Sequence, residues 1–147
     1  MHEVSFDEAL AIICGKDVRF AREGYLFVRD ALNHTQKEIS KKNRDEMRHI
    51  TGQELLTGIR EYALAQYGPM AAMLFQEWGI RNCRDFGVMV FNMVDAGWLA
   101  KTETDSITDF ESGYDFHEAF EKPFLPASKR GDKEIVVVAQ PTTQAGL

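Results

Sequence analysis

The stretch FGVMVFNMVDAGWLAKTETD, from Phe86 to Asp105, decides the predicted fold. It begins with a mostly apolar run, reaches Gly97, and then becomes polar and acidic. This order predicts a helix that begins near Asn82 and ends at Gly97, because glycine is a common helix stop. Short strands at 98–101 and 113–116 would follow, with a polar loop between them. A winged-helix domain presents its recognition helix and wing in this order.

The residues before this stretch predict four more helices. Ser5 to Glu8 and Thr51 to Glu54 each have the form of a capping box, in which two residues satisfy one another's free backbone groups at a helix start. The expected helices run from Phe6 to a stop at Gly15, from near Asp17 to Ile39, from Thr51 to Tyr67, and from Met70 to Gly79. The charged run KKNRDEMRH, residues 41–49, lacks an apolar stripe and is predicted to be a loop.

These elements predict a mainly α protein: a helical hairpin followed by a three-helix unit with a small β-hairpin, which resembles a winged helix. At 147 residues the chain is long enough for one well-buried core. We expect one compact α-rich domain over residues 1–124, with the hairpin at 1–40 and the winged-helix-like unit at 51–120. Residues 125–147 are expected to form a C-terminal extension that is partly mobile.

The charge of the chain argues against DNA reading by the third helix of this unit. The formal net charge is −6, and Cys83 to Glu121 alone holds two basic and nine acidic residues. Each contact to a phosphate needs a cation, so this segment would be repelled by DNA. The helix from Phe86 to Val94 is also apolar on nearly every side, which is typical of a helix buried in the core or in a partner interface.

The cysteines and the N-terminus predict a cytoplasmic protein. Cys14 and Cys83 are far apart and form no metal-binding or redox motif, which favours reduced thiols. The sequence shows no signal peptide and no apolar run long enough to cross a membrane. We therefore expect no membrane partner.

Two charged segments supply the candidate interaction residues. The first is the basic segment 37–48 together with His49, and the second is the acidic segment 105–111. The candidate interaction surface consists of Lys41, Lys42, Arg44, Arg48, His49, Asp105, Asp109 and Glu111.

His49 stands out because Arg48 and His49 directly precede a capped helix start. It would act as a base beside a bound anion, or it would hold the loop through hydrogen bonds, and we favour the second. The acidic segment does not match the EF-hand pattern, and the histidines lack zinc spacing. No catalytic residue, cofactor site or metal ligand is assigned.

Several motifs together resemble a family of small bacterial cytoplasmic proteins without an assigned activity. The motifs are RHITGQELLTGIREYAL, YGPMA, WGI, DFGVMVFNMV, KTETDS, DF and YDFHEAF. The resemblance covers about Phe6 to Phe124. It implies a compact bacterial protein of one domain, and it carries over no catalytic or binding residue.

Three functions are compatible with these patterns. The leading hypothesis is a non-enzymatic protein–protein interaction module that self-associates as a homodimer or larger homo-oligomer, or that binds another protein. The first alternative is a nucleic-acid- or ribosome-associated factor that uses the basic segment 37–48, with RNA or the ribosome as its partner. The second alternative is a metal-dependent enzyme built on Asp105, Asp109 and Glu111.

Overall fold

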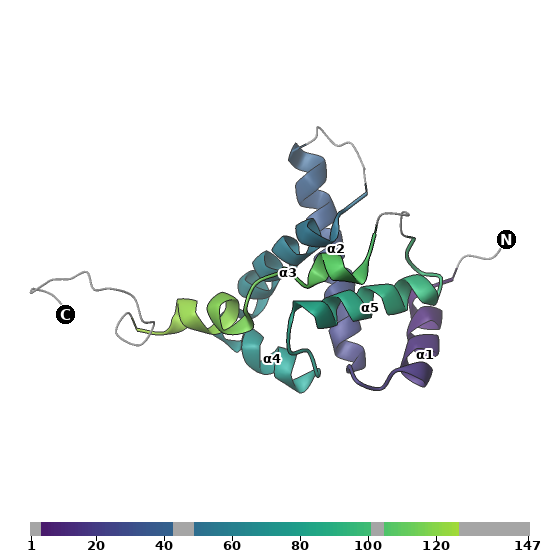
Figure 1. Ribbon diagram of the computed structural model, residues 1–147, viewed down its shortest axis with the longest axis horizontal. Helices are drawn as coiled ribbons and strands as arrows, with labels where there is room; N and C mark the ends of the chain where they lie inside the picture. Colours follow the sequence, from purple (N-terminus) through teal and green to yellow (C-terminus); the bar gives the residue numbers. More distant parts are fainter. Residues whose placement is uncertain (1–3, 43–48, 101–104, 127–147) are drawn as a thin grey trace, which may run out of the picture.

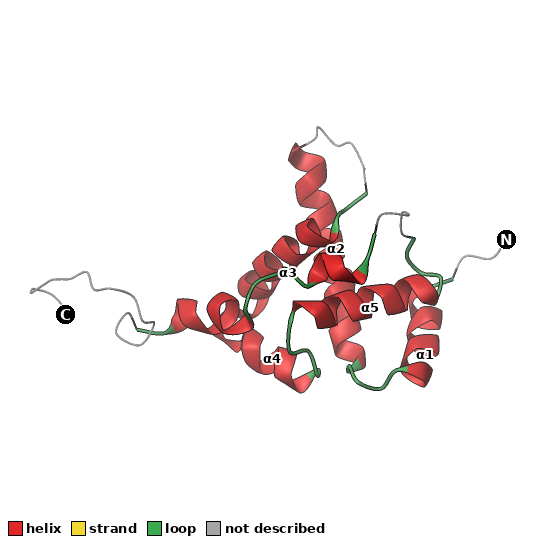
Figure 2. Ribbon diagram, in the orientation of Figure 1, coloured by secondary structure: helices red, strands yellow, loops and turns green. Residues whose placement is uncertain are grey.

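Helices joined by loops make up the part of the chain that the structure describes (Figures 1 and 2). This structure is a computed structural model, and it describes residues 4–42, 49–100 and 105–126. The helices are α1 (Phe6–Lys16), α2 (Arg22–Lys42), α3 (Gly52–Tyr67), α4 (Ala71–Glu77) and α5 (Cys83–Asp95). Four short turns, three 3₁₀ and one π (η3), join or follow them: η1 (Gly68–Met70), η2 (Ile107–Phe110), η3 (His117–Glu121) and η4 (Lys122–Phe124). The prediction of a mainly α protein is confirmed.

Both predicted capping boxes form at helix starts. The Ser5 hydroxyl accepts a hydrogen bond from the Glu8 amide at 3.1 Å, and the Glu8 carboxylate accepts one from the Ser5 amide at 3.0 Å. Thr51 and Glu54 make the same reciprocal pair at the start of α3. Because each pair satisfies backbone groups that the helix leaves without partners, these starts are set by local sequence.

The second helix begins later than predicted, at Arg22 instead of near Asp17. The Asp17 amide still donates to the last turn of α1, and Phe20 is buried. The Ala21 amide donates to the backbone oxygen of Trp78, 3.0 Å away and far along the chain. This tertiary hydrogen bond takes the place of a helical one and delays the start of α2.

The predicted β-hairpin is not found in the described residues of its two strands. The chain after α5 turns back on the helix, since the Trp98 amide donates to the Met93 oxygen, and the Trp98 ring packs on Phe6. In the second expected strand, the Tyr114 hydroxyl donates to the Leu56 oxygen at 2.8 Å. Packing of these aromatic side chains on helices therefore overrides their strand propensity. The winged-helix prediction is not supported, because the described residues form no β-hairpin to serve as the wing.

Aromatic rings form the centre of the core. Phe27 of α2 contacts rings from α3, α4, α5 and the residue after α4: Tyr62, Tyr67, Phe75, Phe86 and Trp78. Phe75 in turn contacts Phe116 and Phe120 of the C-terminal segment. The described part of the core extends along the chain from Ala9 to Phe120. None of the described helices has both the length and the apolar character needed to cross a bilayer.

Helix α5 runs across the middle of the molecule, with α1 packed on it at one end (Figure 1). It buries Phe86, Gly87, Met89 and Met93 against its neighbours. Three further apolar side chains of this helix, Val90, Phe91 and Val94, are only partly buried. The predicted all-round apolar helix thus has one side that the described core leaves partly uncovered.

A candidate ligand pocket between α2, α3 and α5

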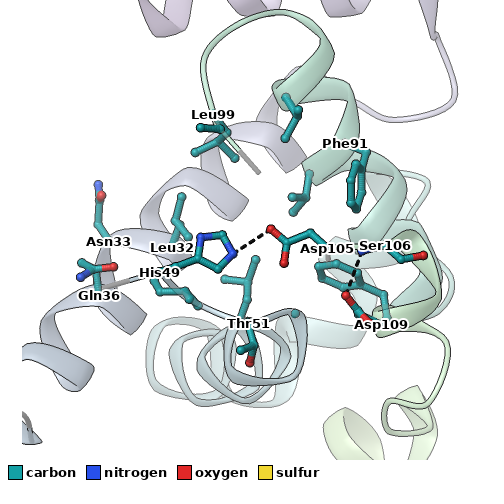
Figure 3. A pocket seen from close by; sticks show the side chains of 17 residues that line it. Leu32, Asn33, Gln36, His49, Thr51, Phe91, Leu99, Asp105, Ser106 and Asp109 are labelled. Carbon is teal, nitrogen blue, oxygen red and sulfur yellow. Dashed lines mark hydrogen bonds and ion pairs between the residues drawn. The ribbon is translucent and has the colours of Figure 1, made fainter. Parts of the chain in front are cut away.

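A pocket of about 320 Å³ lies on the partly uncovered side of α5 (Figure 3). It is bounded by α2, by the start of α3, by α5 with the two residues Leu99 and Ala100, and by the segment that leads into η2. This volume is at the lower end of the range for small-molecule sites, which is about 300–1,000 Å³.

Apolar side chains from three helices form most of the wall. Leu32 of α2, Leu55 of α3, and Val90, Phe91 and Val94 of α5 all line the pocket. Positions 90 and 94 are four residues apart, so they lie on the same side of α5. Asn33 and Gln36 add polar groups from α2, so the pocket joins an apolar wall to a polar rim.

The start of α3 places His49 at the pocket. The capping box fixes Thr51 and Glu54 at the first turn, and His49 lies two residues before the cap. His49, Ile50, Thr51 and Gly52 all line the pocket. The feature that made His49 stand out in the sequence, its position before a capped helix start, is therefore what brings it to this site.

Phe110, the last residue of η2, anchors the side of the pocket that η2 forms. Its side chain is buried between α3 and α5, facing Gly52 on one helix and Gly87 on the other. A Cβ on Gly87 would lie only 2.8 Å from the Phe110 ring, so the fit requires glycine there. The Gln53 side chain also donates to the backbone oxygen of Asp109 at 2.6 Å.

A third capping box shapes the acidic side of the rim. The Asp109 carboxylate accepts a hydrogen bond from the Ser106 amide at 2.9 Å, and the Ser106 hydroxyl accepts one from the Thr108 amide. This local arrangement fixes the turn η2. Ser106 and Asp109 of this capping box, together with the preceding Asp105, line the pocket. The part of the acidic run from Ser106 to Phe110 is therefore a capped turn.

His49 and Asp105 meet at the rim. The Nε2 atom of His49 lies 2.8 Å from Oδ2 of Asp105, and Figure 3 shows the imidazole pointing at the carboxylate. About a fifth of the Asp105 side chain is exposed, against about two fifths for His49. The pair joins the residues before α3 to those before η2, which agrees with the loop-holding role that we favoured for this histidine.

The other predicted site residues within the described part of the chain lie away from this pocket. Lys41 and Lys42 are exposed in the last turn of α2, where Lys41 pairs with Glu38 at 3.4 Å. Glu111 pairs with Arg84 at 3.0 Å and does not line the pocket. Arg44 and Arg48 lie outside the described residues. Of the six candidates that the structure describes, it thus brings together His49, Asp105 and Asp109.

No group of three or more His, Cys, Asp or Glu side chains is arranged to hold a metal ion in residues 4–42, 49–100 and 105–126. The metal hypothesis combines Asp105 with Glu111, but Asp105 pairs with His49 before α3, whereas Glu111 pairs with Arg84 of α5.

Cys83 is a structural residue. It is buried, and its Sγ donates to the backbone oxygen of Tyr114 at 3.3 Å. Burial raises the pKa of the thiol to about 11, so the thiolate is scarce at neutral pH. A nucleophilic role for Cys83 is therefore not supported.

Several pocket residues were not predicted. Val90, Phe91 and Val94 were assigned to packing or to a partner interface, and Asn33 and Gln36 gave no signal in the sequence. The one available clue was the apolar character of the helix on every side, since the core needs only part of it. This pattern does not distinguish a helix side that lines a cavity from one that binds a partner.

Comparisons of the chain with protein-family models, curated proteins and solved structures found no match. The resemblance to small bacterial proteins therefore stays a prediction.

Proposed function

We propose that this protein binds a small molecule that has an apolar body and a polar head. The observation that carries the proposal is the pocket of about 320 Å³, in which an apolar wall faces the His49–Asp105 pair. Small-molecule sites typically combine a mostly apolar lining with a few polar groups that orient the ligand. The apolar body would rest on α2 and α5, and the head would lie at the rim.

The proposal is tested by screening a fragment library by NMR against the full chain and against a variant with a filled pocket. Val94→Phe places a larger side chain on the α5 wall. Val18→Phe makes the same change at an exposed position in the α1–α2 connection, away from the pocket, and serves as the control. We expect fragments to shift the resonances of His49 and Leu99 in the wild type and in Val18→Phe, and to lose these shifts in Val94→Phe.

Two outcomes would contradict the proposal. In one, no fragment binds the wild type with a Kd below about 1 mM. In the other, the fragments that bind retain their affinity for a folded Val94→Phe variant.

A second function, a self-associating interaction module, is favoured by a different observation. Met70, the last residue of η1, and Met73, in the first turn of α4, are each about half exposed, as is Phe124 at the end of η4. Large exposed apolar side chains are frequent where partners bind. This hypothesis predicts a concentration-dependent mass in a dilution series, which the double variant Met70→Glu/Met73→Glu would abolish.

A wild-type protein that stays monomeric at all concentrations would count against self-association.

The RNA and ribosome hypothesis stays a prediction, since Arg44 and Arg48 of its basic segment lie outside the described residues. Without a described wing, no observation favours DNA binding through a winged-helix arrangement.

A further inference from the structure

Most aromatic side chains of this protein pack on another aromatic ring. Phe27 and Phe75, for example, each contact several rings of the core. Such pairs gain free energy beyond the burial of their area, because the electron-rich face of one ring attracts the edge of another. Among the phenylalanines, only Phe91, Phe110 and Phe124 make no ring contact with any residue that the structure describes.

The surroundings of these three rings differ. Phe124 lies at the end of η4, about half exposed, and does not line the pocket. Phe110 lines the pocket, but only 3% of the residue is exposed, so it offers little surface to a ligand. Phe91 lines the pocket and is only partly buried. Of the three, Phe91 is thus the ring that has both an accessible surface and a cavity beside it.

The position of Phe91 on α5 places its ring beside the apolar wall. Val94 follows three residues later, and positions three apart lie on the same side of a helix. Both line the pocket, and Leu32 of α2 lines it from another helix. Figure 3 shows Phe91 extending from α5 into this space. A flat group that entered the pocket would therefore meet one aromatic ring and several aliphatic side chains.

The volume of the pocket limits the size of such a group. About 320 Å³ is the volume of about ten water molecules in the liquid. One benzene ring with a three-carbon chain and a hydroxyl group has about the same number of non-hydrogen atoms. The pocket therefore suits one ring with a short chain better than a fused ring system.

We propose that the apolar body of the ligand is a single aromatic ring, which packs on the ring of Phe91. This inference rests on the proposed function and gives the body of the ligand a chemical class. Burial of the ring supplies most of the affinity, and the contact between the two rings supplies the preference over a saturated ring of the same size. Phe91 is thus a specificity-determining residue.

The test compares two probes that share a head and a chain and differ in the ring: 3-phenyl-1-propanol and 3-cyclohexyl-1-propanol. Each is titrated into the full chain and followed by NMR. Burial alone predicts that the cyclohexyl probe binds at least as tightly, since it has no less apolar surface. We expect instead that the phenyl probe binds about threefold to tenfold more tightly. Nuclear Overhauser contacts should join its ring protons to those of Phe91.

Two variants locate the effect. Phe91→Leu removes the ring and keeps the wall apolar, so it should abolish the preference and leave the affinity for the cyclohexyl probe within about threefold. Phe124→Leu makes the same change away from the pocket, at another ring without an aromatic partner in the described chain, and should keep the preference. Far-UV circular dichroism shows whether each variant is folded. If Phe91→Leu does not fold, the Overhauser contacts in the wild type decide.

The outcomes separate the two proposals. Equal binding of the two probes, or tighter binding of the cyclohexyl probe, overturns the aromatic class and leaves the pocket as a binding site. A preference that persists in a folded Phe91→Leu variant, or a bound phenyl probe without Overhauser contacts to Phe91, also overturns the inference. If neither probe binds, the aromatic class is wrong, and the fragment screen alone decides whether the pocket binds anything.

Discussion

Gly58 and Gly15 are both helical glycines, but their surroundings are opposite. Gly58 of α3 faces Thr35 of α2 at the point where the two helices pack most closely: a Cβ there would overlap Thr35 Oγ1 and lie 2.8 Å from Thr35 Cβ. Thr35 is itself held, because its hydroxyl donates to the Ala31 oxygen at 2.8 Å. Gly15 of α1 is exposed and has no atom within 4 Å of such a Cβ.

Gly58→Ala should therefore lower the free energy of unfolding by about 1–3 kcal/mol, the usual cost of overpacking. Gly15→Ala should raise it by about 0.5 kcal/mol, because alanine favours the helix where space is open. Urea unfolding measures both. The double variant Gly58→Ala/Thr35→Ala should recover part of the loss, and equal effects of the two glycine changes would contradict this account of the helix crossing.

Asp17 predicts a dependence of stability on pH. The Arg19 guanidinium, with hydrogen bonds of 2.9 and 2.7 Å, holds the pKa of the Asp17 carboxyl well below its ordinary value of 3.8, and the Arg19 amide and Asn92 add to this effect. A lowered pKa means that the ionised form stabilises the fold. This contribution is complete above the unfolded-state pKa and is lost as the pH falls below about 4.

Asp17→Asn should lower the unfolding free energy by about 1 kcal/mol at pH 7, since Arg19 is exposed and the pair is partly screened. At pH 2 to 3 the difference between the variant and the wild type should shrink. Urea unfolding at both pH values makes the comparison. A difference that does not depend on pH would show that the charge of Asp17 contributes nothing.

At the scale of elements, the turn η2 connects the core to the candidate pocket. Phe110 anchors it between α3 and α5, and the residues before Phe110 form the acidic rim. Gly87→Ala should push the ring aside, lower the unfolding free energy by about 1–3 kcal/mol, and change the NMR environment of His49. The double variant Gly87→Ala/Phe110→Leu should recover part of the lost unfolding free energy and bring the His49 resonances part of the way back to their wild-type positions. A Gly87→Ala variant in which the His49 resonances stay in place would contradict the link between η2 and the rim.

The two helix starts that carry a predicted capping box could be predicted at this scale, whereas the start of α2 and the β-hairpin could not. The pairs Ser5–Glu8 and Thr51–Glu54 are local signals, and both form as expected. The expected strands depended on short runs around Trp98 and Tyr114, whose conformation is decided by distant partners, Phe6 and Leu56. Propensity summed over four residues is too weak to overcome such contacts.

At the scale of the whole molecule, the described core is continuous from Ala9 to Phe120. This supports a test of the predicted domain boundary, which places a C-terminal extension from residue 125. A chain that ends at Pro126 should keep the unfolding free energy of the full chain to within about 0.5 kcal/mol. Thermal and urea unfolding of both chains provide the check, and a loss of more than about 1 kcal/mol would place part of the extension in the folded domain.

The contact between His49 and Asp105 at the pocket could not be predicted from the sequence. His49 was selected for its place before a helix and Asp105 for its place in an acidic run, and nothing in either pattern indicated that they pair. Their contact depends on how α3 packs on α5 and on the fit of Phe110 between two glycines. Pairing across 56 positions is a property of the assembled fold.

The position of Phe110 has a dynamic consequence. Because the same ring fills the core and anchors the rim, any local opening that releases η2 must also uncover Gly52 and Gly87. A ligand that bridges the rim and the α5 wall would oppose that opening. Native-state hydrogen exchange should then report occupancy of the pocket as slower exchange at amides of α5 that no ligand touches.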